Sequence, residues 1–438
     1  MSLDNNLNGV IINNYQIIKL IGTGAYGLVY LAKNLQTGEH IAIKAISKII
    51  NKKISKPSDL LSNKLLEFFN NGNSTINGLK SLDLVKLSNC NIDKDLPPCP
   101  FLKEVVIHLK LHQHPNIITI HQILDFNYCI FIIMDYYSEG DLFVNIVDKK
   151  IYQNSISLIK NCFIQLLDVI SYCHSKGIFH CDIKPENIMV SSNGSKLIIG
   201  DFGLATQCEF INSKICVGSS YYMPPERLCQ LNHNLSSSIE YPSNKGDLWS
   251  LSIILINLIC IRNPWMKASE QDPTFNAFLQ NPKILLKILP ISNELYEILI
   301  KCLIENPFER ISLFELRDLI INCNKFTKDG PLSKIDSLDQ YMNLNQECLI
   351  PDYNNSTNSL EKKKSKTLSI GNSPILNQIY NNEPLNVLKF LSNGKNTGNM
   401  EPMISIHHIN HINNYDNYSL MTNLSFNMNM DLEQQVGY

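Results

Sequence analysis

The middle of the chain holds polar residues whose types and spacing suit proton transfer and metal binding. The string HCDIKPEN and the later string DFG supply His180, Asp182, Lys184, Asn187 and Asp201. A carboxylate such as Asp182 can accept the proton of an attacking hydroxyl group. The oxygen atoms of Asn187 and Asp201 are ligands that suit Mg2+. These residues therefore predict chemistry at a phosphate group that a metal ion helps to hold.

A glycine-rich string near the N-terminus is typical of a nucleotide site. Gly22, Gly24 and Gly27 in GTGAYG can bring backbone N–H groups onto phosphates, because no Cβ atom intervenes. The string leads into Val29 and a second strand pattern, whereas a dinucleotide-binding unit would open a helix here. Taken alone, a plain glycine-rich turn remains the alternative. The other loop residues of the predicted nucleotide site are Ile21, Thr23, Ala25 and Tyr26.

A strand lysine and a proline–glutamate string complete the pattern. Lys44 ends the strand pattern IAIK, where an ammonium group would bind the α- and β-phosphates of a nucleotide. The string PPE at residues 224–226 closes the segment that begins at Asp201. A single strand lysine is usually only an exposed charge, but all of these motifs in this order indicate one site.

With these motifs the chain resembles the eukaryotic serine/threonine protein kinases over residues 15–324. The resemblance implies an α+β, bilobal fold. A small antiparallel β-sheet with helix αC would form the N-lobe (15–134), and a larger helical C-lobe would span residues 138–324. It also implies transfer of the γ-phosphoryl group of ATP, with Mg2+, to serine and threonine hydroxyls of protein substrates. The strings GSSYYMPPER, HCDIKPEN and HPNII resemble a fungal branch of nutrient- and starvation-responsive kinases.

The resemblance assigns roles residue by residue. Lys44 would pair with a glutamate of helix αC, for which we choose Glu104 because EVVI leads into HPNII; Glu67 is the competitor. The catalytic residues implied are Lys44, Glu104, Asp182, Lys184 and Asn187, and the Mg2+ ligands implied are Asn187 and Asp201. The adenine and ribose contacts implied are Val29, Ala42, Asp135, Tyr137, Asp141 and Met189, beside a gatekeeper at Met134.

Other matching positions would be structural or would select the substrate. Asp247 and Trp249 resemble the helix αF anchor of the catalytic loop, and Arg310 resembles the partner of Glu226. Lys184 and Ser219 indicate serine/threonine rather than tyrosine phosphorylation. The peptide-groove carboxylates Glu186 and Asp141 would favour arginine before the acceptor residue, whereas Asn257 replaces an acid that would select a second arginine.

One position departs from the family pattern. The usual arginine before the catalytic aspartate is Cys181 here. That arginine normally holds a phosphorylated activation loop through charge-assisted hydrogen bonds, which a cysteine cannot form. We therefore expect activity that does not depend on this clamp, although Thr206 and Ser213 remain candidates for modification. Cys181 is interpreted as a small buried residue rather than a redox switch.

Two stretches fall outside the kinase pattern. Residues 50–100, rich in Asn, Ser and Lys, have no firm apolar period and are expected to loop out as an insertion between core elements. Residues 325–438 are dense in Asn and Ser and are expected to be a disordered tail. Helical spacing predicts helices over residues 101–112, 157–176 and 312–321. The sequence does not define the regulatory partners of the insertion and the tail.

Composition indicates which partners and which cell compartment to expect. A net charge of −2 gives no support for nucleic acid or membrane as a main partner, and thirteen scattered cysteines without C-x-x-C spacing favour free thiols in a reducing compartment. The polar start MSLDNNLNGV predicts no secretory signal, and the apolar run 248–261 is too short to span a bilayer. We expect a cytoplasmic protein, with the nucleus as a second location. A pseudokinase scaffold is the main alternative, disfavoured by the intact Lys44, Asp182, Asn187 and Asp201.

Overall fold

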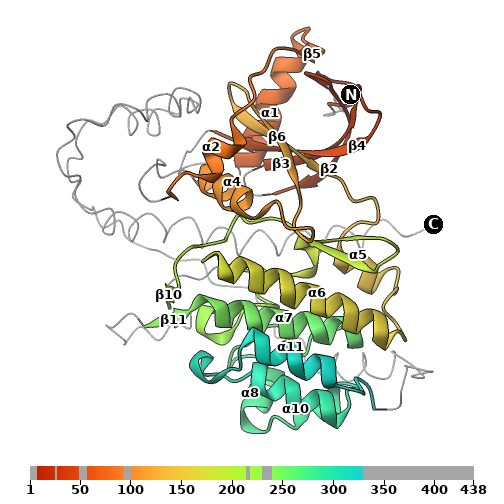
Figure 1. Ribbon diagram of the computed structural model, residues 1–438, viewed down its shortest axis with the longest axis vertical. Helices are drawn as coiled ribbons and strands as arrows, with labels where there is room; N and C mark the ends of the chain where they lie inside the picture. Colours follow the sequence, from red (N-terminus) through yellow and green to blue (C-terminus); the bar gives the residue numbers. More distant parts are fainter. Residues whose placement is uncertain are drawn as a thin grey trace, which may run out of the picture.

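The structure, a computed structural model, has two lobes stacked one above the other (Figure 1). It describes residues 7–24, 27–48, 57–92, 100–213, 218–228 and 239–328. The N-lobe is built on a β-sheet and the C-lobe is mainly helical, so the predicted α+β bilobal fold is confirmed. Ala25 and Tyr26 of the glycine-rich string lie outside the described residues, and so does the predicted tail beyond residue 328.

The N-lobe sheet has seven strands in the order β5-β1-β2-β3-β4-β7-β6. All neighbouring strands are antiparallel except β1 and β5, which are parallel. The last of these seven strands in the sequence, β7, lies between β4 and β6. The strand bounds are β1 Ile11–Ile12, β2 Tyr15–Thr23, β3 Gly27–Asn34, β4 His40–Ser47, β5 Thr75–Ile76, β6 Ile120–Asp125 and β7 Cys129–Asp135.

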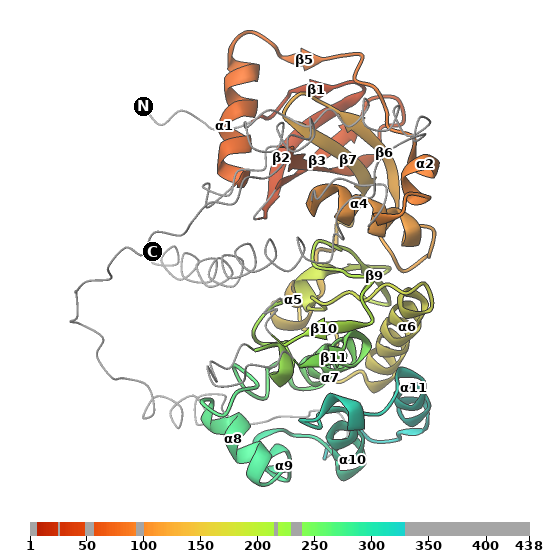
Figure 2. The same cartoon turned by 90° about the vertical axis from the view of Figure 1, so that its left-hand side faces the viewer.

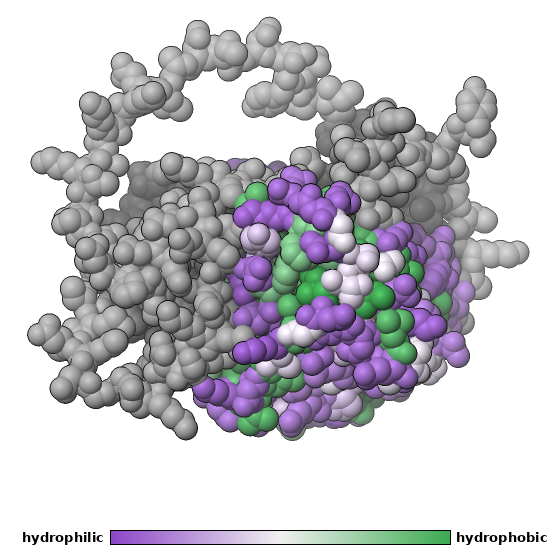
Figure 3. All heavy atoms as spheres, turned by 90° about the horizontal axis from the view of Figure 1, so that it is seen from above, coloured by the Kyte–Doolittle hydropathy of each residue, from purple (hydrophilic) through white to green (hydrophobic). Residues whose placement is uncertain are grey.

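Helices cover both faces of this sheet, with α1 on one side and α2 and α4 on the other (Figure 2). Successive side chains of a strand point to opposite faces. On β7, Phe131 and Ile133 pack in the cluster that contains α1, whereas Ile130 and Ile132 pack in the cluster that contains α4. The helix bounds are α1 Pro57–Asn70, α2 Leu84–Ser88 and α4 Pro100–Leu111. Seen from above, the coloured surface is largely hydrophilic, with smaller hydrophobic areas between (Figure 3).

The described part of the stretch expected to loop out, residues 57–92, packs onto the N-lobe sheet. Leu61, Leu65, Leu66 and Phe69 lie on one buried face of α1. Their spacing is helical, but the many Asn and Ser residues around them hide the period. Residues 74–82 then reach both ends of the sheet: β5 pairs with β1, and backbone hydrogen bonds join Leu82 to Ile123 and Asp125 to Lys80.

The C-lobe is organised around α7, in which nearly every residue is buried. A helix that is apolar all round belongs in the core of a lobe. Two short ribbons, β8–β9 and β10–β11, complete the lobe. The helix bounds are α5 Leu142–Val147, α6 Ile156–Ser175, α7 Ser243–Cys260, α8 Pro273–Gln280, α9 Ile284–Ile288, α10 Asn293–Cys302 and α11 Leu313–Asn322. The remaining bounds are β8 Ile188–Ser191, β9 Lys196–Ile199, β10 Phe210–Asn212, β11 Glu240–Pro242 and the 3-10 turns η1 Pro185–Asn187, η2 Pro225–Arg227 and η3 Pro307–Glu309.

Within the described part of the chain, α6 alone is long and apolar enough to cross a membrane by length and composition. It is instead a core helix of the C-lobe. Cys162, Phe163, Leu166 and Leu167 on α6 are fully buried in the main hydrophobic cluster. The apolar side chains of α6 therefore pack against the rest of the C-lobe. The expectation that a membrane is no main partner stays a prediction.

Candidate active site

Three charged residues predicted from separate motifs meet between the lobes. Lys44 lies on β4, where Ile43 and Ala45 face the α1 side and Lys44 faces the opposite side. Its Nζ atom lies 2.5 Å from Glu104 Oε1 on α4 and 3.1 Å from Asp201 Oδ1. The competitor Glu67 lies exposed on α1. The structure thus brings the chosen glutamate, and not its competitor, to the strand lysine.

The three groups influence one another's ionisation. Burial alone would lower the pKa of Lys44, but the Asp201 and Glu104 carboxylates outweigh it and the net pKa is raised. In return, the Lys44 ammonium group lowers the pKa of Asp201 to about 2. At neutral pH the site therefore holds a lysine cation and an aspartate anion, a state suited to binding phosphates and a divalent cation.

A column of rings joins α4 to the catalytic loop. The ring of Phe202 lies 5.1 Å from that of His108 and 5.0 Å from that of His180, measured between centroids. His108 Nε2 also hydrogen-bonds the carbonyl oxygen of Ile118 at 2.8 Å. His108 is not among the residues predicted from the sequence, although it lies one helical turn after Glu104 and so on the same face of α4. The column thus connects the helix that carries Glu104 with the catalytic loop.

The catalytic loop forms a compact polar network around Asp182. Its Oδ1 atom accepts hydrogen bonds from the N–H and the hydroxyl of Ser219, at 2.9 and 3.1 Å. Lys184 Nζ donates to Ser219 Oγ at 3.0 Å and lies 3.4 Å from Asp182 Oδ2. Asn187 Nδ2 donates to the carbonyl oxygen of Asp182 at 2.9 Å and to Oδ2 at 3.2 Å. All four predicted residues therefore come together.

A buried carboxylate on α7, that of Asp247, anchors the catalytic loop. Asp247 accepts hydrogen bonds from the backbone N–H groups of His180 and Cys181, at 2.9 and 2.8 Å, and its side chain contacts His174 Nε2 at 2.8 Å. Burial alone would raise the pKa of Asp247, but the bond with His174 helps to lower it, so the anchor stays ionised. Cys181 and Asp201 have left-handed backbone angles, with φ of 67° and 55°. Such conformations persist only where their surroundings hold them, which the anchor does for Cys181.

Two of the residues predicted to contact the nucleotide, Val29 and Ala42, lie on strands β3 and β4 of the N-lobe sheet. On β3, Val29 pairs with Lys44, and on β4, Ala42 pairs with Met134 of β7. A Cβ atom on Gly27 would lie 2.5 Å from the carbonyl oxygen of Ala45, so this position requires glycine. The described loop residues Ile21, Thr23 and Gly24 are exposed, and Gly22 is half-buried.

The residues expected at adenine and ribose follow β7. Asp135 ends the strand, and the hydroxyl of Tyr137 donates to Asp135 Oδ2 at 3.2 Å. Asp141 pairs with Met189 in an isolated bridge, and its Oδ1 atom accepts from the N–H of Val144 at the start of α5. Asp135, Tyr137 and Asp141 lie on the segment that connects the two lobes. Their contacts with adenine and ribose stay a prediction.

The donor set fits Mg2+ as a bound cofactor. Because the amide nitrogen of Asn187 is committed to Asp182, its carbonyl oxygen is the atom left for a cation. Asp201 adds an ionised carboxylate. Among the described residues there is no cluster of three His, Cys, Asp or Glu side chains that could hold a metal alone. Mg2+ usually binds through one or two carboxylates together with substrate phosphates and waters, which matches this set.

The segment from Asp201 to Glu226, the activation segment, is joined to the C-lobe by a buried ion pair. Arg310 donates two hydrogen bonds of 2.7 Å to the two carboxylate oxygens of Glu226. Its guanidinium group also lies over the ring of Trp249, at 4.7 Å from the ring centre. The pair of Arg310 with Glu226 that the sequence predicts is therefore present.

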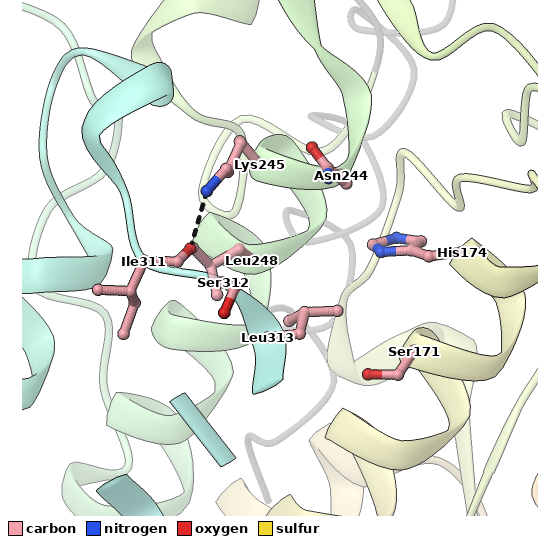
Figure 4. Close-up of a pocket in the computed structure, with 8 residues that line it drawn as sticks. All are labelled: Ser171, His174, Asn244, Lys245, Leu248, Ile311, Ser312 and Leu313. Carbon is pink, nitrogen blue, oxygen red and sulfur yellow. Dashed lines mark hydrogen bonds between the residues drawn. The ribbon is translucent and has the colours of Figure 1, made fainter. Parts of the chain in front are cut away.

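The described residues also line a pocket in the C-lobe, between α6, α7 and the start of α11 (Figure 4). Lys245 Nζ donates to the carbonyl oxygen of Ile311 there, at 3.1 Å. None of the residues predicted for catalysis, nucleotide or metal lines this pocket. Its lining residues are Ser171, His174, Asn244, Lys245, Leu248, Ile311, Ser312 and Leu313.

Comparison with known proteins agrees with this geometry. The family described as the protein kinase domain matches residues 68–319, which is more than half of the chain. The chain belongs to the protein kinase family. The match begins after the glycine-rich string and Lys44, which the structure places in the same site.

Curated yeast proteins extend the likeness. The chain is 41% identical to the serine/threonine-protein kinase VHS1 of Saccharomyces cerevisiae, over 80% of this chain and 78% of that protein. It is 38% identical to the serine/threonine-protein kinase SKS1 of the same yeast, over 75% of this chain and 69% of that protein. A Schizosaccharomyces pombe protein named negative regulator of sexual conjugation and meiosis is 36% identical, over 74% and 63%. The predicted membership in a fungal branch of serine/threonine kinases is confirmed.

The family membership establishes the reaction class. This protein is an ATP-dependent serine/threonine protein kinase, and its substrates are proteins with serine or threonine acceptors. The scaffold alternative finds no support, since Lys44, Asp182, Asn187 and Asp201 are all present. Lys44 contacts Asp201, and Asn187 contacts Asp182.

Proposed function

We propose that this kinase transfers the γ-phosphoryl group of Mg-ATP through Lys44, Asp182, Lys184, Asn187 and Asp201. The observation that carries the proposal is the contact of Lys44 with both Glu104 and Asp201, beside an Asp182 held by Ser219 and Asn187. A phosphoryl-transfer site acts mainly by positioning and charge stabilisation, and these contacts supply both.

Each residue has a definite part in this proposal. Lys44, oriented by Glu104, binds the phosphates of ATP. Asp182 orients the substrate hydroxyl and accepts its proton, while Lys184 stabilises the negative charge that develops nearby. Asn187 and Asp201 would hold Mg2+, which when bound supplies positive charge to the phosphates. Val29, Ala42 and the backbone from Asp135 to Tyr137 enclose the adenine.

Substrate choice is proposed to depend on the carboxylates beside the loop. Glu186 is exposed on the 3-10 turn that contains Asn187, and Asp141 begins α5. Two carboxylates at the peptide groove would favour arginine shortly before the acceptor. Asn257 offers no further charge, because its side chain is a neutral amide, whose nitrogen donates to the carbonyl oxygen of Arg262 and to Asn263 Oδ1.

A transfer assay with Mg-ATP and a degenerate peptide library tests the proposal. We expect the purified protein to phosphorylate serine and threonine peptides, and to select upstream arginine. Asp182→Asn should abolish transfer while ATP binding, measured by thermal shift, stays nearly unchanged. Equal activity of Asp182→Asn and wild type would refute the assigned base. A library without upstream arginine selection would refute only the role of the groove carboxylates.

A further inference from the structure

A buried arginine follows the glutamate of the activation segment. Arg227 ends the turn η2, and only 5% of its surface is exposed. Its Nη1 atom donates to the carbonyl oxygen of Cys181 at 3.3 Å, and its Nη2 atom lies 3.4 Å from Cys181 Sγ and 3.5 Å from the carbonyl oxygen of Ser243. Arg227 thus reaches the residue directly before Asp182, where the family pattern would place an arginine.

The contact matters because the backbone at Cys181 is left-handed. A residue other than glycine pays a steric penalty in that conformation, so its neighbours must hold it. The N–H of Cys181 is bound by Asp247, while its carbonyl oxygen and its sulfur are bound by Arg227. Burial raises the pKa of the Cys181 thiol to about 11, so the sulfur stays neutral and does not pair as an anion. Arg227 and Asp247 therefore fix both peptide groups that flank this residue.

The first turn of α7 makes room for the guanidinium group. A Cβ atom on Gly246 would lie 2.9 Å from Arg227 Cζ and 2.9 Å from Nη2. Real Cβ atoms do not approach other heavy atoms so closely. Gly246 lies in a helix and has no positive φ, so its backbone conformation does not require glycine. Glycine is required here because Arg227 approaches so closely. Cys181, Arg227 and Gly246 therefore form one packed unit, which we call the arginine clamp.

Hydrogen bonds between protein groups join the activation segment to the same place. Strand β10 of this segment pairs with β11, with Ile211 opposite Tyr241. Ser243, at the start of α7, donates its N–H to the carbonyl oxygen of Glu209 and its hydroxyl to that of Cys208. Arg227 contacts Ser243 on the other side. The catalytic loop, the activation segment and α7 thus meet at the arginine clamp.

We propose that Arg227 is a positioning residue, which holds the catalytic loop against the activation segment in place of a phosphate-dependent clamp. The inference rests on the proposed function, since it concerns the placement of Asp182. Arg227 acts through the backbone of Cys181 and does not touch substrate or nucleotide. A purely structural role would lower stability, whereas a positioning role lowers turnover in protein that is still folded and still binds ATP.

The test compares four proteins with wild type in the peptide transfer assay, before and after phosphatase treatment. Arg227→Met removes the guanidinium group. Arg227→Lys keeps the positive charge but loses the planar set of N–H donors. Gly246→Ala leaves Arg227 in place but displaces its guanidinium group, and alanine favours the helix more than glycine. Arg317→Met is the matched control, because Arg317 forms an exposed ion pair with Asp168.

We expect kcat to fall roughly 10- to 100-fold in Arg227→Met and in Gly246→Ala, with ATP binding unchanged. Arg227→Lys should recover part of this loss, and amide exchange at residues 180–182 should be faster in both impaired variants. Wild type and Arg317→Met should keep full activity after phosphatase treatment. Full turnover in both Arg227→Met and Gly246→Ala, or wild-type activity lost with phosphatase, would overturn the inference. A wild-type protein that phosphorylates no peptide would instead overturn the proposed function.

Discussion

Lys44 and Glu104 lie 60 residues apart in the sequence and 2.5 Å apart in space. Because this separation is longer than is usual in kinases, the sequence alone also allowed Glu67 as the partner of Lys44. Structurally the two glutamates differ completely, because Glu104 faces the site from α4 while Glu67 faces solvent on α1. Removing a single well-placed electrostatic partner in an active site typically costs about two to three orders of magnitude in turnover.

A pair of matched substitutions therefore separates the two glutamates. We expect Glu104→Gln to lower kcat/KM for peptide phosphorylation roughly 10²- to 10³-fold, since Lys44 loses the carboxylate that orients it. Glu67→Gln should leave kcat/KM unchanged. Steady-state kinetics with one library-selected peptide measures both. A larger loss in Glu67→Gln than in Glu104→Gln would reverse the assignment.

His108 makes the stability of the protein depend on pH. Burial lowers the pKa of His108 from 6.5 to about 4 in the folded protein. Between these two values the unfolded chain binds the extra proton, so the free energy of unfolding falls as the pH drops from 6.5 towards 4. The loss attributable to His108 approaches about 3 kcal/mol at the lower end. Urea unfolding at several pH values should show a shallower dependence for His108→Leu than for wild type; identical curves would contradict this.

At the scale of elements, α1 shows what local sequence patterns reveal and what they hide. The motifs at residues 22–27, 180–187 and 201–203 are contiguous strings, so their identity and order could be predicted from the sequence. Asn and Ser residues interrupt the apolar period of α1, so its packing against the sheet could not be predicted from the sequence. The contacts of Arg227 with Cys181, and of β10 with β11, join segments about 30 to 45 residues apart, which no local period encodes.

The packing of α1 predicts that it stabilises the N-lobe. Leu65 is fully buried among Leu61, Phe69 and the side chains of the sheet. Leu65→Ala should lower the free energy of unfolding by about 2–5 kcal/mol, because a cavity replaces the lost side chain. Val85→Ala, at a position on α2 that is 71% exposed, should change it by less than about 0.5 kcal/mol. Denaturant unfolding of both variants measures the contrast, and equal effects would argue against a core role for α1.

At the scale of the whole molecule, packed residues extend past the predicted domain bounds of 15–324. Leu7 and Val10 are buried in the N-lobe core. At the other end, Phe326 is fully buried, and Thr327 bridges to Ile291. Backbone hydrogen bonds join Ser292 to Phe326 and Lys328 to Pro290.

Two truncated proteins locate the C-terminal boundary. A chain that ends at residue 328 should unfold at the same denaturant concentration as the 438-residue chain. A chain that ends at residue 324 lacks Phe326, and should lose about 3–5 kcal/mol because that ring no longer fills its place in the core. Chemical denaturation followed by tryptophan fluorescence compares the three. Equal stability of the two truncated chains would place the boundary before residue 325.

The position of β7 in the sheet has a consequence for synthesis on the ribosome. Strand β7 lies between β4 and β6, yet it is the last of the seven to be made. About 90 residues separate the end of β4 at Ser47 from the end of β7 at Asp135. At roughly 5–20 residues per second, the edge of β4 waits about 4 to 18 seconds for its partner. During that interval the nascent chain exposes the unpaired N–H and C=O groups along β4, so the N-lobe of this kinase is prone to aggregate until β7 has emerged.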